Sequence, residues 1–111
     1  MSTGEFVELN KENEHILVCL SSSPSNEKII RTAAKMARDM RARFTALYVQ
    51  TGKRERESDK RRLEAHVQSA KESGAEIVMT HGENVPVQIA EYAHLSNVTK
   101  IVIGQSSAKR N

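Results

Sequence analysis

The sequence of 111 residues predicts one α/β domain with an open parallel sheet and helices on both faces. The first observation is that short apolar runs alternate along the chain with longer segments of helical periodicity. The second is the order of these segments, β-α-β-α-β-α-β, in which the crossovers are right-handed and successive strands are parallel. We expect the spatial strand order 3-2-1-4, with the first and fourth strands adjacent at a switch point.

The first predicted strand is the apolar run 16–20, which is continuous, as in a strand buried on both faces. Residues 21–25, with the sequence SSSPS, end this strand and lead into a helix. The apolar face of that helix has spacings of three and four and consists of Ile29, Ala33, Met36, Ala37 and Met40. Ser23 or Ser25 either caps the helix or contacts a ligand, because a helix N-terminus favours both hydroxyls and anions.

The second predicted strand, 44–49, is rich in aromatic and branched side chains. A polar loop over 50–60 follows it and contains several cations. The next helix is expected to begin at Ser58 or Asp59 and to end at Ser73, with Gly74 as its C-cap. Its narrow apolar face consists of Leu63, Val67 and Ala70.

The third predicted strand is 75–80, and Val85-Pro86 opens the last helix, since proline is tolerated in a first turn. The expected buried face of this helix is Ile89, Ala90 and Ala93. The fourth strand covers 99–103 and stops at Gly104. Residues 1–14 are polar and weakly patterned, so we interpret them as a linker or an expression remnant that precedes a ligand-binding domain over 15–111.

Composition narrows the classes of function. The net charge of +3 is compatible with an anionic ligand but is too small to indicate nucleic acid, and 4% aromatic content without tryptophan disfavours a base-stacking platform. No apolar stretch is long enough for a membrane span and no signal peptide opens the chain, so this domain is expected to contact no membrane. The single cysteine, Cys19, lies within a strand; it fits a reducing cytoplasm and a packing role better than a nucleophile.

Signals for catalysis are absent from the sequence. Its four histidines, His15, His66, His81 and His94, have no metal-ligand spacing, and each is expected at the surface or an edge. There is no nucleophile elbow, no phosphate loop with a lysine and no carboxylate pair. The first, second and fourth strands also lack an acidic residue at their carboxyl ends, where an acid–base catalyst would lie. The sequence therefore predicts a binding module without a cofactor.

The carboxyl ends of the first and fourth strands locate a candidate site. The serine-rich segment 21–25 follows the first strand, and residues 104–107 follow the fourth. In open α/β sheets ligands bind outside the carboxyl ends of the strands at a switch point. A small ligand with phosphate groups fits a crevice between two such backbone-rich loops.

From His15 to Arg110 the pattern resembles the universal stress protein superfamily. Within it, the nearest resemblance is to the domain found in potassium-responsive sensor histidine kinases of the KdpD type. The residues that resemble its start are ILVCLS at 16–21 with Pro24-Ser25, and those that resemble its closing strand are NVTKIVIG at 97–104. The arrangement Ser-x-Ser at 21–23, twenty residues, then FTAxY at 44–48 is similar to a signature associated with cyclic di-AMP binding.

This resemblance implies a non-catalytic cytoplasmic sensor domain that binds the second messenger cyclic di-AMP and regulates potassium uptake, within a kinase anchored in the plasma membrane. The implied partners are cyclic di-AMP and the other kinase domains; a homodimer sharing one two-fold symmetric ligand stays open. The candidate ligand-binding residues are Ser21, Ser22, Ser23, Thr45, Ala46, Tyr48, Gly104, Gln105, Ser106, Ser107 and Arg110. Phe44 fits the core better than a ligand contact, because it begins the strand far from the crevice.

Two departures from ATP-binding members of the superfamily argue against an ATP site. Those proteins carry an aspartate at the end of the first strand, where this chain has Cys19-Leu20-Ser21. They also carry a glycine-rich phosphate loop after the fourth strand, where this chain has Gly104-Gln105-Ser106-Ser107. The fifth strand of the superfamily fold is missing as well, which leaves the fourth strand as an open edge. The alternative function is therefore a degenerate nucleotide fold that docks proteins within the kinase.

Overall fold

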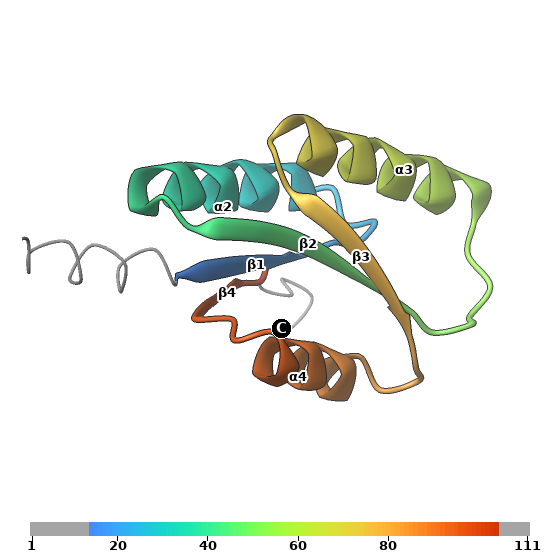
Figure 1. Ribbon diagram of the computed structural model, residues 1–111. Coiled ribbons are helices and arrows are strands. Elements are labelled where there is room, and N and C mark those ends of the chain that lie inside the picture. The colour runs from blue at the N-terminus through green and yellow to red at the C-terminus, as the bar shows by residue number, and fades with distance from the viewer. Residues whose placement is uncertain (1–13, 105–111) are drawn as a thin grey trace, which may run out of the picture.

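A computed structural model describes residues 14–104 (Figure 1). Its elements are β1 (His15–Cys19), α2 (Asn26–Met40), β2 (Arg43–Gln50), α3 (Glu57–Glu72), β3 (Glu76–His81), α4 (Val85–Leu95) and β4 (Lys100–Val102). The predicted order of elements is confirmed. Their ends differ from the predicted ones by one or two residues, as for α3, which begins at Glu57.

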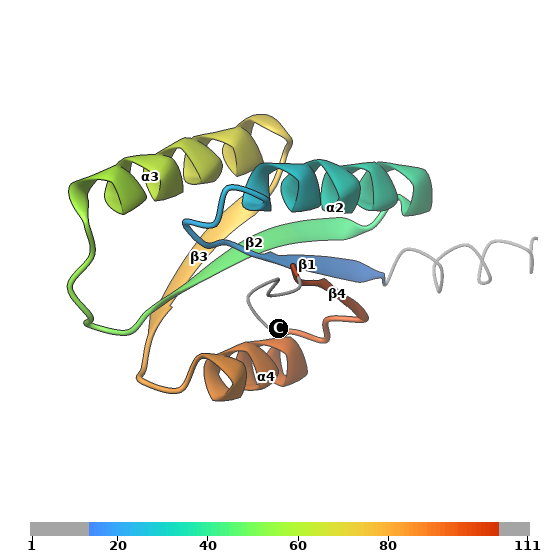
Figure 2. The same ribbon diagram turned by 180° about the vertical axis from the view of Figure 1, so that it is seen from behind.

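The four strands form one parallel sheet in the order β3-β2-β1-β4, as predicted. Val18 of β1 lies opposite Ala46 on one side and Val102 on the other. Helices α2 and α3 cover one face and α4 covers the other (Figures 1 and 2). Within residues 14–104 no fifth strand follows β4, so this strand forms one edge of the sheet.

The larger part of the core lies between the sheet and the α2–α3 layer. Its buried members are Ile16, Val18, Leu20, Ile30, Ala33, Ala37, Ala46 and Ala70. The predicted helix face is correct for Ala33 and Ala37, whereas Met36 and Met40 pack at its margin and are half-buried. Ile30, which the predicted face omitted, is fully buried. Phe44 packs against this core, as predicted.

The smaller part of the core lies under α4. Leu17, Leu47 and Val49 are its buried members, and Ile89 and Ala93 of α4 are among the half-buried residues packed on them. Ala90 was expected on the same face, but this prediction is wrong because the side chain is exposed. Residues 89 and 93 lie about one turn apart on one stripe, and residue 90 is rotated by about 100° from residue 89 and about 60° from residue 93.

The helix ends follow local chemistry. Gly74 has φ 95° just after α3, the left-handed conformation expected of a residue that ends a helix. The Asn84 side chain caps α4 by accepting a hydrogen bond from Val87 N at 3.1 Å, and Pro86 lies in the first turn. None of the helices α2, α3 and α4 is both long enough and apolar enough to cross a membrane.

His15 and His66 are buried, so the prediction that every histidine lies at the surface or an edge is wrong for these two. His15 Nδ1 donates to the Ser96 carbonyl at 3.0 Å, and its Nε2 is 2.8 Å from the Thr45 hydroxyl. Both ring nitrogens therefore have hydrogen-bonding partners, so the imidazole is buried without an unsatisfied polar atom. Through these two contacts the imidazole links β1 to β2 and to the end of α4.

Candidate functional site

A pocket of about 220 Å³ lies at the carboxyl ends of β1 and β2. Its walls come from the serine loop (21–25), the end of β2, the loop that follows β2 and the first turns of α4. The lining residues are Cys19, Leu20, Ser21, Ser22, Leu47, Tyr48, Val49, Thr51, Glu55, Val85 and Ile89. In α/β proteins ligands bind at this end of the sheet, outside the carboxyl ends of the strands.

The structure brings three of the predicted site residues together in this pocket: Ser21, Ser22 and Tyr48. Ser23 is exposed on the same loop but is not among the lining residues. Thr45 and Ala46 are fully buried further back in β2, where Thr45 pairs with His15.

The predicted crevice beside β4 is described only as far as Gly104. This glycine lies against α2, since a Cβ at its position would collide with the Ile29 side chain. Gly104 does not line the pocket at the carboxyl ends of β1 and β2. The remaining predicted residues, Gln105, Ser106, Ser107 and Arg110, lie outside the described residues.

The hydroxyls of the serine loop hold the loop's own shape. Ser23 N donates to Ser21 Oγ at 3.2 Å, and Ser25 N donates to Ser23 Oγ at 3.3 Å. The Ser23 and Ser25 hydroxyls are 3.0 Å apart. Ser25 occupies the N-cap position of α2, yet its side chain makes no capping bond there, so the side-chain cap considered at Ser25 does not form.

Three side chains hold the serine loop in place through hydrogen bonds to its backbone. The sequence analysis did not assign them to the site. Asn26, only 2% exposed, accepts from Ser21 N at 3.2 Å and donates to the Cys19 carbonyl at 3.0 Å. From α3, His66 Nδ1 donates to the Ser21 carbonyl at 2.8 Å, and Arg62 donates to the Ser22 carbonyl at 3.0 Å.

The sequence carried a signal for His66 that the prediction did not use. His66 is three residues after Leu63 and four before Ala70, so it falls on the buried face of α3. Asn26 and Arg62 have no comparable signal. Their partners are backbone atoms of a loop that is distant in sequence from Arg62 and irregular in conformation.

Burial raises the pKa of two groups in the pocket wall. It raises the pKa of the Cys19 thiol to about 11, so the thiol stays protonated at neutral pH and is a weak nucleophile. Burial, and secondarily the Glu55 carboxylate, raises the pKa of Tyr48. Within residues 14–104 no cluster of three potential metal ligands occurs. The pocket therefore offers neutral hydroxyls, an aromatic ring and one carboxylate.

The model of the universal stress protein family matches residues 12–110. The chain is 47% identical over 94 residues to the sensor protein KdpD of Clostridium acetobutylicum, an alignment that covers 85% of this chain and 10% of that protein. It is 29% identical over 97 residues to the sensor protein KdpD of Escherichia coli K12, covering 86% and 11%. The chain thus spans about a tenth of the length of these relatives.

Solved structures have the same fold. A universal stress protein from Archaeoglobus fulgidus is 26% identical with a TM-score of 0.63, and the match covers 88% of this chain and 79% of the other. The same organism's universal stress protein in complex with dAMP is 26% identical with a TM-score of 0.57, covering 82% and 80%. UspA from Lactobacillus plantarum, 21% identical with a TM-score of 0.62, covers 90% and 84% and supports the fold alone.

Proposed function

Because the chain belongs to the universal stress protein family, we propose that it is the ligand-sensing domain of a KdpD-type sensor kinase and binds cyclic di-AMP. The observation that carries the kinase assignment is the 47% identity to a KdpD protein across 85% of the chain. The relative from A. fulgidus that is solved with dAMP supports an adenine nucleotide as the class of ligand.

The pocket supports a nucleoside as the part of the ligand that enters it. Tyr48 contributes an aromatic side chain for a base to the pocket lining, and Ser21 and Ser22 contribute hydroxyl groups. Leu47 and Ile89 supply the apolar surface that a purine ring requires. The serine pair and the FTAxY segment of the cyclic di-AMP signature lie on the loop and strand that form this pocket.

The proposed role is binding without catalysis. The domain would pass the signal to other domains of the kinase. It would act on the cytoplasmic side of the membrane, and the regulated process would be potassium uptake. A two-fold symmetric ligand also suits two copies of this domain, so the proposal includes a ligand-bridged dimer.

Calorimetric titration of the purified domain with cyclic di-AMP tests this proposal, with ATP and cyclic di-GMP as controls. The expected result is micromolar or tighter binding of cyclic di-AMP, with no heat from the two controls. Absence of binding at high micromolar cyclic di-AMP would overturn the ligand assignment. Sedimentation of the same samples reports whether the ligand joins two copies.

A second candidate function is protein docking within the kinase, favoured by the edge strand β4. Ile101 and Ile103, on and just after this strand, are 43% and 55% exposed. An unpaired strand edge with apolar side chains is a template for another chain. This function predicts that a domain without affinity for any of the three nucleotides still associates with the rest of the kinase.

A further inference from the structure

The loop between β2 and α3 forms part of the pocket and also carries exposed positive charge. Thr51 and Glu55 line the pocket. Lys53 and Arg54 lie between these two residues in the sequence and Arg56 follows Glu55, and all three side chains are exposed. We call these three cations the basic rim, because each lies within two positions of a residue that lines the pocket.

The basic rim has no partner inside the described part of the chain. The ion pairs found between residues 14 and 104 involve Arg31, Lys35, Arg43 and Arg62, and none includes a rim residue. Arg56 also occupies the N-cap position of α3 without a side-chain capping bond. The positive end of the α3 dipole is complemented by Glu57 and Asp59 in the first turn of the helix, so the rim cations are not needed there for the stability of the helix.

The pocket itself is too small and too negative to hold the phosphates of a dinucleotide. Its volume of about 220 Å³ is below the roughly 300–1,000 Å³ of most small-molecule sites, so part of a larger ligand remains outside. The Glu55 carboxylate in its wall repels phosphate oxygens. A ligand whose nucleoside enters the pocket therefore leaves its phosphates outside, and the loop that carries the cations contributes two residues, Thr51 and Glu55, to the pocket lining.

We infer that the basic rim, Lys53, Arg54 and Arg56, is the phosphate subsite of this domain and attracts the phosphodiester groups of the ligand that the pocket accepts. The inference rests on the proposed function and adds residues that the cyclic di-AMP signature does not contain. In this inference the pocket binds the base of the ligand, and the basic rim binds its phosphate groups. Exposed cations act through a screened field, so this subsite makes binding depend on salt.

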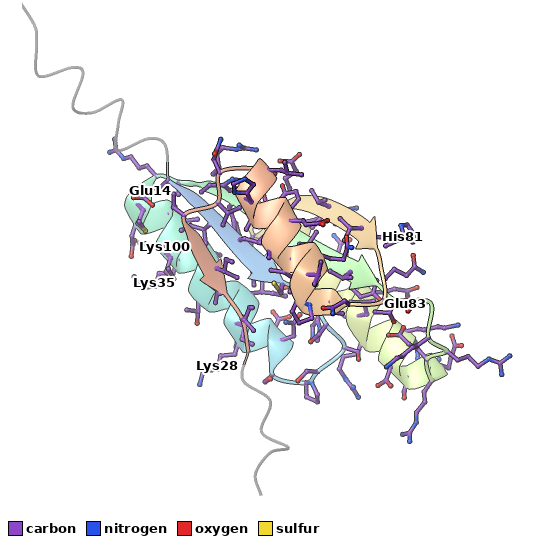
Figure 3. All side chains as sticks on the ribbon, turned by 90° about the horizontal axis from the view of Figure 1, so that it is seen from below. Glu14, Lys28, Lys35, His81, Glu83 and Lys100 are labelled. Atoms are coloured by element: carbon purple, nitrogen blue, oxygen red, sulfur yellow. The ribbon has the colours of Figure 1, made fainter. Side chains whose placement is uncertain are left out.

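The experiment compares two triple variants with the same change in charge. The first replaces the basic rim, K53Q/R54Q/R56Q. The control, R38Q/K71Q/K100Q, removes three exposed cations from the other end of the sheet, where α2 and α3 end and β4 begins. Figure 3 shows Lys100 at the same end as Glu14, opposite the end marked by His81 and Glu83. Circular dichroism establishes that both variants are folded.

Affinity for cyclic di-AMP is measured by calorimetry at about 50 and about 300 mM NaCl, a change that shortens the screening length by a factor of about 2.4. The expected result is a Kd at least tenfold higher for the rim variant at low salt, with a weaker dependence on salt than in the wild type. The control variant should stay within about threefold of the wild type and retain its salt dependence.

The outcomes separate this inference from the proposed function. If the wild-type domain binds and the rim variant matches the control in affinity and salt dependence, the phosphate subsite is overturned while the ligand assignment stands. If the wild-type domain does not bind cyclic di-AMP at either salt concentration, the proposed function fails and the subsite fails with it.

Discussion

Tyr48 and Glu55 determine the charge at one wall of the pocket, and their coupling is measurable. The pKa of the Tyr48 phenol is raised by burial and, to a lesser extent, by the negative charge of Glu55. Glu55→Gln removes the repulsion that opposes phenolate formation, so the pKa of Tyr48 should fall while remaining above its ordinary value, because burial persists.

Absorbance of the phenolate during alkaline titration checks this prediction. The chain has two tyrosines, so the titration is carried out in a Tyr92→Phe background, which leaves Tyr48 as the sole reporter. An unchanged pKa in the Glu55→Gln variant would mean that the carboxylate does not act on this wall.

Cys19 provides a second test at the scale of a side chain. Its pKa is about 11 in the folded protein against 9.0 ordinarily, so above pH 9 the unfolded chain loses a proton that the folded chain keeps. The folded state then binds more protons, and stability falls as the pH rises toward 11. The loss should be about 1 kcal/mol, because partial exposure of the thiol weakens the effect.

Urea unfolding of the wild type and Cys19→Ala at about pH 7 and about pH 10 measures this loss. The alanine variant lacks the titrating group and should lose less stability between the two pH values. The thiol should also react slowly with alkylating reagents at neutral pH, since the thiolate is the nucleophile. Equal losses in both proteins would contradict the assigned shift.

At the scale of elements, the connection between β1 and α2 depends on Asn26. This side chain satisfies Ser21 N and the Cys19 carbonyl from a position that is 2% exposed. Asn26→Ala leaves both backbone groups without these partners and should lower the free energy of unfolding by about 2 kcal/mol. The change should also weaken ligand binding, because the serine loop loses its support.

Asn84→Ala is the matched control for this prediction. Asn84 is exposed and makes one capping bond, to Val87 N, so its removal should cost about 1 kcal/mol. Both variants are compared by urea unfolding. Asn26 would have no special role if its replacement cost no more than that of Asn84.

The elements themselves were predictable because each apolar pattern had one solution. The runs at 16–20 and 44–49 are too short for helices, and the stripe at Leu63, Val67 and Ala70 has only helical spacing. The polar residues that join the elements were not predictable in the same way. His15 and Thr45 satisfy each other across two strands, and this pairing depends on a register that periodicity does not encode.

The candidate site was predictable where topology alone decides its place. Ser21, Ser22 and Tyr48 follow or end neighbouring parallel strands, so the sheet brings them to one edge. Glu55 and Thr51 were not predicted, because the loop that carries them has no pattern that fixes its path. Val85 and Ile89 join the pocket only through the packing of α4 on the opposite face from α2 and α3.

At the scale of the whole molecule, the two layers on the sheet are unequal. Among residues 14–104, the core cluster on the α2–α3 side has eight buried members and the cluster on the α4 side has three. No residue of α4 is itself fully buried, while Leu95 is 80% exposed. Local stability follows buried apolar contact, so α4 should open more readily than the elements that cover the other face.

Amide hydrogen exchange of the native domain tests this inequality. Amides of α4 should exchange at least tenfold faster than those in the middle of α2, β1 and β2, because opening α4 exposes little core. Saturating cyclic di-AMP should slow exchange in α4 more than in α2, since Val85 and Ile89 line the pocket from the first turns of α4. Equal protection of α2 and α4 without ligand would show that the thin layer is as stable as the thick one. Slowing confined to α2 would place the ligand away from α4, on the serine-loop side of the sheet edge alone.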